Sequence, residues 1–230
     1  GKIYLIGGKN SSDQNINQVI CFDPSSNQWS SKASMPTARD GMWLQWYNDR
    51  IWAIGGHSGG DTDVVESYDP ISDTWKTETS LSTKRNWAVG WVDKGKIFVG
   101  GGNDGPSSYL DSIEAYDSST KQWAIVGNLP EKTYNAGAVV LNDKVYVIAG
   151  STASNVYSNK VYAADLNASL EGVFDLYRKD GNASAGTPLV QAEVADGSVT
   201  GSKMADGAVT ASKIASKTIG KDQISDDILK

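Results

Sequence analysis

Side chains that could do chemistry are few in this chain, which has one histidine, His57, and one cysteine, Cys21. A catalytic triad needs an imidazole beside its nucleophile and a zinc site needs several imidazoles or thiols together, and we predict neither in this chain. Carboxylates remain, because Asp61, Asp63 and Glu66 lie close together in the sequence and a carboxylate pair can hydrolyse a glycoside. Such clusters are mostly solvated loops. We therefore predict no catalytic residue, no metal site and no cofactor.

Two arginines are better suited to recognition than to catalysis. Arg39 and Arg85 lie 46 residues apart and occupy matching positions in a repeated pattern. Two guanidiniums facing one site could hold a ligand carboxylate through paired hydrogen bonds. Alternatively, each arginine braces its neighbouring unit through backbone carbonyls. The sequence leaves both interpretations open.

The elements that must position these side chains are short strands that are repeated four times at a period of about 47 residues. Residues 1–8, 50–56 and 96–101 carry a β-branched and aromatic run closed by a glycine pair, and residues 144–150 carry a weaker copy. Each run is too short for a helix and reads as a buried strand. The glycine pairs are expected where the backbone needs positive φ or where another segment comes too close for a Cβ.

Each unit contains further strands around that run. In the first three units an aromatic residue is followed by Asp, and a tryptophan comes six residues after that Asp. Turn residues lie between the Asp and the tryptophan, as in a hairpin. The first unit begins at its second strand, and in the fourth unit residues 172–177 are a candidate outer strand. Additional strands are predicted before the glycine-ended runs at residues 40–47, 86–92 and 135–141.

This pattern of glycine pairs, Tyr-Asp and spaced Trp resembles the kelch repeat over residues 1–165. The resemblance implies an all-β propeller over residues 1–180, with four recognisable blades. Because such rings use roughly five to seven blades, we expect an incomplete ring with further blades upstream. The alternative is a small four-bladed ring closed by an exchanged strand. The resemblance also implies a ligand site at one loop edge, made from Arg39, Arg85, His57, Asn103, Asp104, Tyr134 and Asn135.

The last 50 residues, 181–230, follow a different rule, in which an aliphatic residue recurs at every fifth position. A step of five fits neither a straight helix nor a flat strand, so we predict a bent, repetitive, non-helical stalk. Because one buried aliphatic side chain offsets only part of the ordering cost of five residues, intertwined chains forming a homotrimer are favoured over a single-chain solenoid. The other possibility is a disordered polar linker. The predicted contact positions are Val199, Met204, Val209, Ile214, Ile219 and Ile224.

The composition of the chain argues against some classes of binding partner. The net charge is −6 with acidic and basic residues interspersed, so we expect no nucleic acid partner, and no apolar run is long enough for membrane insertion. The repeats at the end of the chain resemble those of phage tail fibres and bacterial surface proteins. We therefore expect a non-enzymatic binding or adhesion module, displayed extracellularly, on a cell surface or on a virion, that recognises a glycan or surface protein. The alternatives are a carbohydrate-active enzyme, of the sugar-acid epimerase or sialidase kind, and an intracellular scaffold.

Overall fold

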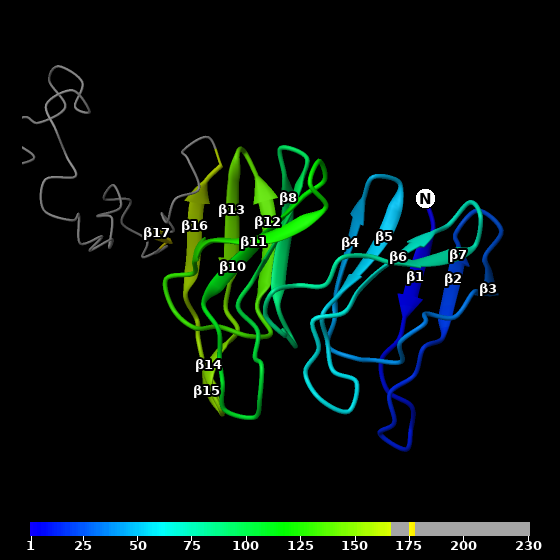
Figure 1. The fold of residues 1–230 in the computed structure, drawn as a ribbon, viewed down its shortest axis with the longest axis horizontal. Helices are drawn as coiled ribbons and strands as arrows, with labels where there is room; N and C mark the ends of the chain where they lie inside the picture. The colour runs from blue at the N-terminus through cyan, green and yellow to red at the C-terminus, as the bar shows by residue number, and fades with distance from the viewer. Residues whose placement is uncertain (167–174, 178–230) are drawn as a thin grey trace, which may run out of the picture. The chain divides into compact units, whose positions relative to one another are not determined.

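The computed structural model describes residues 1–166 and 175–177, and every regular element in those residues is a β-strand. Within this part of the chain the strands form four antiparallel sheets, here called blades 1 to 4 in chain order, and one separate hairpin (Figure 1). No helix there is long and apolar enough to cross a membrane. The predicted stalk, with its aliphatic positions from Val199 to Ile224, lies outside the described residues.

The strands of blades 1 to 3 follow one another directly in the chain, and in blade 4 a separate hairpin interrupts them. Blade 1 contains β1 (Ile3–Ile6), β2 (Val19–Asp23) and β3 (Gln28–Lys32). Blade 2 contains β4 (Trp43–Tyr47), β5 (Arg50–Ile54), β6 (Val65–Asp69) and β7 (Thr74–Thr77). Blade 3 contains β8 (Val89–Asp93), β9 (Lys96–Gly100), β10 (Ser112–Asp117) and β11 (Gln122–Asn128). Blade 4 contains β12 (Gly137–Leu141), β13 (Lys144–Ile148), β16 (Val161–Asp165) and β17 (Asp175–Tyr177), and the hairpin is β14 (Ser151–Ala153) with β15 (Val156–Tyr157).

This architecture confirms the four repeated units. Blade 1 has three strands and begins at its second strand, as the sequence predicts. β17 pairs with β16 through Ala163 and Asp175, so an outer strand does form within the predicted range 172–177. The β14–β15 hairpin was not predicted, and it replaces the loop expected after the fourth glycine-ended strand.

Aspartates close the hairpins that join the third and fourth strands of the units. Asp23, Asp69 and Asp117 each accept a hydrogen bond at Oδ1 from the backbone N–H two residues further on, at 2.8–2.9 Å. Asp117 also accepts one from the Ser119 hydroxyl, and this bond does most to lower the pKa of Asp117, to about 2. The predicted turn chemistry is therefore present at matching positions in three blades.

The core lies between the blades. Ile97 and Val99 of β9 pack with Trp52 and Ile54 of blade 2 in one buried cluster. Similar clusters join blade 1 to blade 2 and blade 3 to blade 4. At the positions that match Ile97, Ile3 is 53% exposed whereas Val145 is fully buried. The difference follows from packing, since blade 1 has no blade before it in the described residues.

The repeated tryptophans join each blade to the one before it. Trp75 of β7 donates from Nε1 to the Ala33 carbonyl at 2.8 Å, and Trp123 of β11 donates to the Thr79 carbonyl at 3.0 Å. Each ring also lies against the tyrosine of its own blade, with centroids 5.2 Å apart. Trp29, at the matching position of blade 1, is 55% exposed. The spaced tryptophans of blades 2 and 3 are thus hydrogen-bond donors to the blade before them.

Candidate functional site at the loop edge

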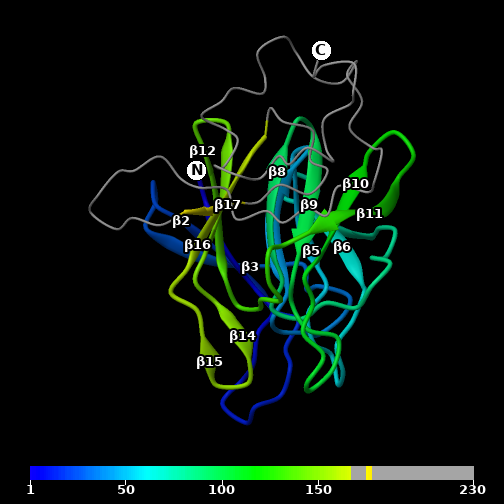
Figure 2. The same cartoon turned by 90° about the vertical axis from the view of Figure 1, so that its left-hand side faces the viewer.

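The loops that follow β1, β5 and β9 and the β14–β15 hairpin extend from the same end of the sheets, at the bottom of both Figure 1 and Figure 2. Each loop begins with a glycine pair of positive φ in blades 1, 2 and 3. The second glycine donates its N–H to a carbonyl just ahead of the next blade. The pairs are Gly8 with Arg39 at 2.9 Å, Gly56 with Arg85 at 2.7 Å and Gly102 with Thr133 at 2.8 Å. The loop edge is therefore connected from blade to blade by backbone hydrogen bonds.

Arg39 is fully buried beside that edge. Its guanidinium donates to the carbonyls of Ala53 and Gly55 at 3.0 and 2.9 Å, to the Thr37 carbonyl at 3.2 Å and to the Glu66 carboxylate. Desolvation lowers the pKa of Arg39, and the Glu66 carboxylate opposes that shift. Because its backbone is bonded to blade 1 and its head to blade 2, the side chain braces the two blades.

Arg85 repeats the arrangement one blade later, also fully buried. It donates to the Glu114 carboxylate from Nε at 3.1 Å and from Nη2 at 3.0 Å. Its other N–H groups donate to the Gly101 carbonyl and to the carbonyl and hydroxyl of Ser112 at 2.8–2.9 Å. All five donors of this guanidinium are thus satisfied inside the protein.

These contacts correct the expectation that Arg39 and Arg85 hold a ligand carboxylate. Neither guanidinium is exposed, and each is bonded to carbonyls and a carboxylate of the following blade. Glu66 is also removed from the candidate carboxylate cluster, because it is 2% exposed and paired with Arg39. The contacts support bracing, the other interpretation of these residues.

The order of the residues suggests that Tyr134 and Asn135 of the fourth unit match Arg39 and Asp40 of the second, but the structure shifts this match by one residue. Thr133, not Tyr134, accepts the glycine N–H and so matches Arg39 and Arg85. Tyr134 instead matches the residues that follow the arginines, and Asn135 matches Gly41, with φ of 54° and 62°.

The residues that follow Arg39, Arg85 and Thr133 are held by paired backbone hydrogen bonds to the loop of the blade that they precede. The partners exchange N–H to carbonyl hydrogen bonds at 2.8–3.2 Å. They are Asp40 with His57, Asn86 with Asn103 and Tyr134 with Ser151. The structure therefore places His57 and Asn103 of the predicted site at equivalent points of successive blades, with Ser151 at that point in blade 4, and it places Tyr134 at the point equivalent to Asp40 and Asn86.

Polar side chains meet between blades 2 and 3. Asn103 Nδ2 donates to Asp61 Oδ2 at 3.1 Å, and His57 Nδ1 lies 3.8 Å from Asp40 Oδ1. Burial raises the pKa of Asp61, His57 and a hydrogen bond from Asn86 oppose the shift, and the negative charges of Asp104 and Asp40 add to it. Asp104, a predicted site residue, is itself exposed. We call Asp40, His57, Asp61, Asn86 and Asn103 the axial cluster.

Trp87 lies beside the axial cluster and was missed by the sequence analysis. Its side chain is 43% exposed, and its φ of 53° is rare for a bulky residue. Backbone hydrogen bonds of 2.8 Å hold it on both sides, from Trp87 N–H to the Gly41 carbonyl and from Asn135 N–H to the Trp87 carbonyl. Its position directly after Asn86 was the available signal, but exposure of a tryptophan cannot be read from a sequence.

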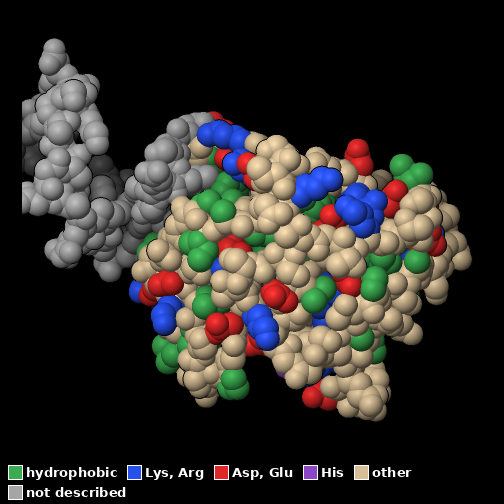
Figure 3. All heavy atoms as spheres, in the orientation of Figure 1, with side chains coloured by type: hydrophobic (Ala, Val, Ile, Leu, Met, Phe, Trp, Pro, Cys, Tyr) green, Lys and Arg blue, Asp and Glu red, His purple; other side chains and the backbone are tan. Residues whose placement is uncertain are grey.

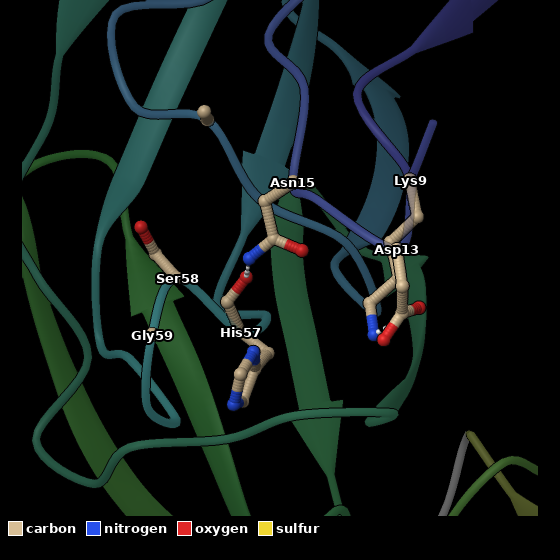
Figure 4. A pocket seen from close by; sticks show the side chains of 7 residues that line it. Lys9, Asp13, Asn15, His57, Ser58 and Gly59 are labelled. Atoms are coloured by element: carbon tan, nitrogen blue, oxygen red, sulfur yellow. Dashed lines mark hydrogen bonds and ion pairs between the residues drawn. The ribbon is translucent and has the colours of Figure 1, made fainter. Parts of the chain in front are cut away.

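An open hollow of about 510 Å³ lies next to His57, between the loops of blades 1 and 2 (Figure 4). Asn15 Nδ2 donates to the His57 carbonyl at 2.6 Å across it, and Lys9 Nζ pairs with Asp13 Oδ1 at 3.0 Å. On the face shown in Figure 3, acidic and basic side chains are interspersed. Among the described residues, no three His, Cys, Asp or Glu side chains are grouped to hold a metal ion.

Comparison with known proteins agrees with this fold. Residues 1–128 match the KLHDC2/KLHL20/DRC7 Kelch-repeats domain, and residues 132–163 match the Kelch motif. Among solved structures, that of YjhT matches with a TM-score of 0.65 at 18% sequence identity, over 77% of this chain and 62% of that one. At this identity the likeness shows the fold alone. The family match spans more than half of the chain, so this protein belongs to the kelch-repeat family, whose propellers are general scaffolds for binding.

Proposed function

We propose that this chain is a non-enzymatic binding module that recognises a glycan on a cell or virion surface through the loop edge of its kelch blades. The observation that carries the proposal is the exposed Trp87 beside the axial cluster. An aromatic face next to hydrogen-bonding groups suits a sugar ring, which has an apolar face and a rim of hydroxyls.

The hydrogen bonds and aromatic contacts along the loop edge support glycan binding. The backbone at Trp87 is fixed by hydrogen bonds to Gly41 and Asn135, so the chain that carries the ring need not be ordered when a ligand covers it. Tyr109 and Tyr134 stack beside one another with centroids 5.0 Å apart, which extends the aromatic surface towards blade 4. The loops of blades 1 and 2 contribute the hollow beside His57.

Replacing Trp87 with Ala is expected to weaken glycan binding about thirtyfold, because truncating a central aromatic contact costs about 2 kcal/mol. A glycan array followed by titration calorimetry on the strongest ligand measures the change. Trp29→Ala is the matched control, since Trp29 is similarly exposed at 55% but lies on the outer strand β3. Equal loss in the two variants would count against a site at Trp87, and no glycan bound by the unaltered chain would contradict the proposal.

We also propose that residues 181–230 present this head on a homotrimeric stalk. The five-residue spacing of aliphatic positions supports the proposal. Light scattering is expected to give about three times the chain mass, and Val199→Asp with Ile214→Asp is expected to reduce it to one chain, because charges on the shared axis are costly to bury. A single-chain mass for the unaltered protein would rule the trimer out.

A further inference from the structure

The strand β1 of blade 1 is paired along one edge only. Among the described residues it pairs with β2 alone, whereas β5, β9 and β13, its counterparts in the other blades, each pair with a strand on both sides. The second neighbour there is β4, β8 or β12, the first strand of each four-stranded blade. Blade 1 lies at one end of the row of blades (Figure 1). Backbone N–H and C=O groups of β1 therefore point to an open edge, where another strand can pair with them.

Two apolar side chains of blade 2 face blade 1 and are exposed. Leu44 and Trp46 of β4 are 36% and 54% exposed. They lie opposite Ala53 and Ile51 in the β4–β5 pairing, and those two residues belong to the core cluster that joins blade 1 to blade 2. Because directly opposite residues of antiparallel strands lie on the same face of the sheet, Leu44 and Trp46 also face blade 1.

The junction of blades 2 and 3 shows what covers the matching positions there. Gly90 of β8 matches Leu44 in the strand pairing and is buried. A Cβ on Gly90 would stand 2.8 Å from the ring of Trp43, at the start of β4. The first strand of one blade thus covers the first strand of the next. Blade 1 has no such strand among the described residues, which accounts for the exposure of Leu44 and Trp46.

The strands of the chain are already in use. Every described strand lies in a sheet, so a second copy could supply a strand to β1 only by breaking one of its own sheets. Residues 181–230 are assigned above to a homotrimeric stalk, and the choice of donor rests on that proposal. A strand of another polypeptide is the remaining source.

We propose that blade 1 binds an extended segment of a partner protein, which adds to β1 as an antiparallel fourth strand. Backbone hydrogen bonds to β1 supply affinity, and the partner side chains that cover Leu44 and Trp46 supply specificity. This docking surface is separate from the glycan site, because it uses the edge of β1 and one face of β4.

The structure also indicates which residues the partner strand carries. Its first and third positions face blade 2, because Trp43 at the first position of β4 faces the next blade and side chains alternate along a strand. At the junction of blades 2 and 3 a large residue, Trp43, meets the small Gly90. Since Leu44 takes the place of that glycine, a small residue suits the first position of the partner strand and an apolar residue the third.

The probe is a synthetic peptide with the sequence of residues 135–143, which spans β12 and has glycine and valine at the first and third strand positions. The labelled peptide is expected to bind the full chain in fluorescence anisotropy and to slow amide hydrogen exchange in β1. Trp46→Asp is expected to weaken binding at least about tenfold, because it places a charge against apolar side chains. Leu141→Asp is the matched control, since Leu141 is 57% exposed on β12 and is expected to leave binding unchanged.

N-methylation of the peptide distinguishes strand addition from adsorption to an apolar surface. Successive N–H groups of a strand point to opposite edges. Methyl groups on alternate residues therefore block pairing with β1 in one of the two possible patterns and leave it possible in the other. Only one of the two methylated peptides is expected to lose binding.

Equal effects of the two methylation patterns, equal effects of Trp46→Asp and Leu141→Asp, or no binding of the peptide would each overturn strand addition at β1. Slow exchange of the β1 amides in the free chain would also overturn the inference. If that protection rises with chain concentration, a second copy supplies the strand. If it does not, residues 178–230 of the same chain supply it. None of these results bears on glycan binding through Trp87.

Discussion

Replacing Glu114 with Ala is expected to lower the free energy of unfolding by about 3–5 kcal/mol, because it leaves the Arg85 guanidinium buried without its countercharge. Both side chains are 0% exposed, and Glu114 also accepts hydrogen bonds from the backbone N–H groups of Ser82 and Thr83 at 2.7 and 3.2 Å. Removing one carboxylate therefore leaves several donors of the segment that connects blades 2 and 3 unpaired. Urea unfolding followed by tryptophan fluorescence gives the change.

The control is an ion pair on the surface of the same blade. Lys96 lies 3.5 Å from Asp117, with the two side chains 49% and 40% exposed. Lys96→Ala is expected to change the unfolding free energy by less than about 1 kcal/mol, since solvent screens such pairs. If Glu114→Ala costs no more than this control, the buried pair does not brace the blades and the backbone bonds alone hold them together.

The repeat explains why so much of the fold could be predicted. The glycines that end strands indicate positive φ, and the Asp residues indicate turns closed by side-chain hydrogen bonds. The spaced tryptophans indicate a hydrogen-bond donor to the neighbouring blade, so each motif agrees with the fold. The ends of the individual strands were predicted less accurately than their existence. The predicted strand 40–47 begins at Trp43 in the structure, because Asp40 is engaged with the loop at His57 and Gly41 has a φ of 62°.

The role of the arginines could not be decided from their own positions. An arginine ahead of a strand looks the same whether its head reaches solvent or turns inward. The partners are far away in sequence, since Glu66 and Glu114 lie on the third strand of blades 2 and 3. The available signal was co-occurrence: the glutamate is present in the two blades that an arginine precedes, and Tyr162 takes its place in blade 4.

The positions of several candidate residues at the loop edge could be predicted, but the residues around them could not. His57 and Asn103 do lie at the loop edge, because every loop that follows a glycine-ended strand leaves the same end of its blade. Tyr134 lies there because it pairs with Ser151, which follows the fourth such strand. The exposure of Trp87 depends on how neighbouring blades meet. Such contacts between segments far apart in the chain leave no local pattern.

Replacing Gly55 with Ala is expected to lower the unfolding free energy by about 2–5 kcal/mol, from about 1–2 kcal/mol of left-handed strain and about 1–3 kcal/mol of overpacking. Gly55 has a φ of 64°, and a Cβ there would stand 2.3 Å from the Arg85 carbonyl oxygen. That oxygen cannot move away freely, because it also accepts the Gly56 N–H at 2.7 Å. Blades 2 and 3 would have to separate at the loop edge, and urea unfolding measures the cost.

Gly95 separates the two contributions. It has a similar φ of 72° in the turn between β8 and β9, but a Cβ there would meet nothing within 4 Å. Gly95→Ala is therefore expected to cost only the strain, about 1–2 kcal/mol, so the excess in Gly55→Ala measures the contact with Arg85. Equal costs at the two positions would mean that the blades yield at this point. The glycine pair would then serve the turn itself and would not be needed for the close approach of neighbouring blades.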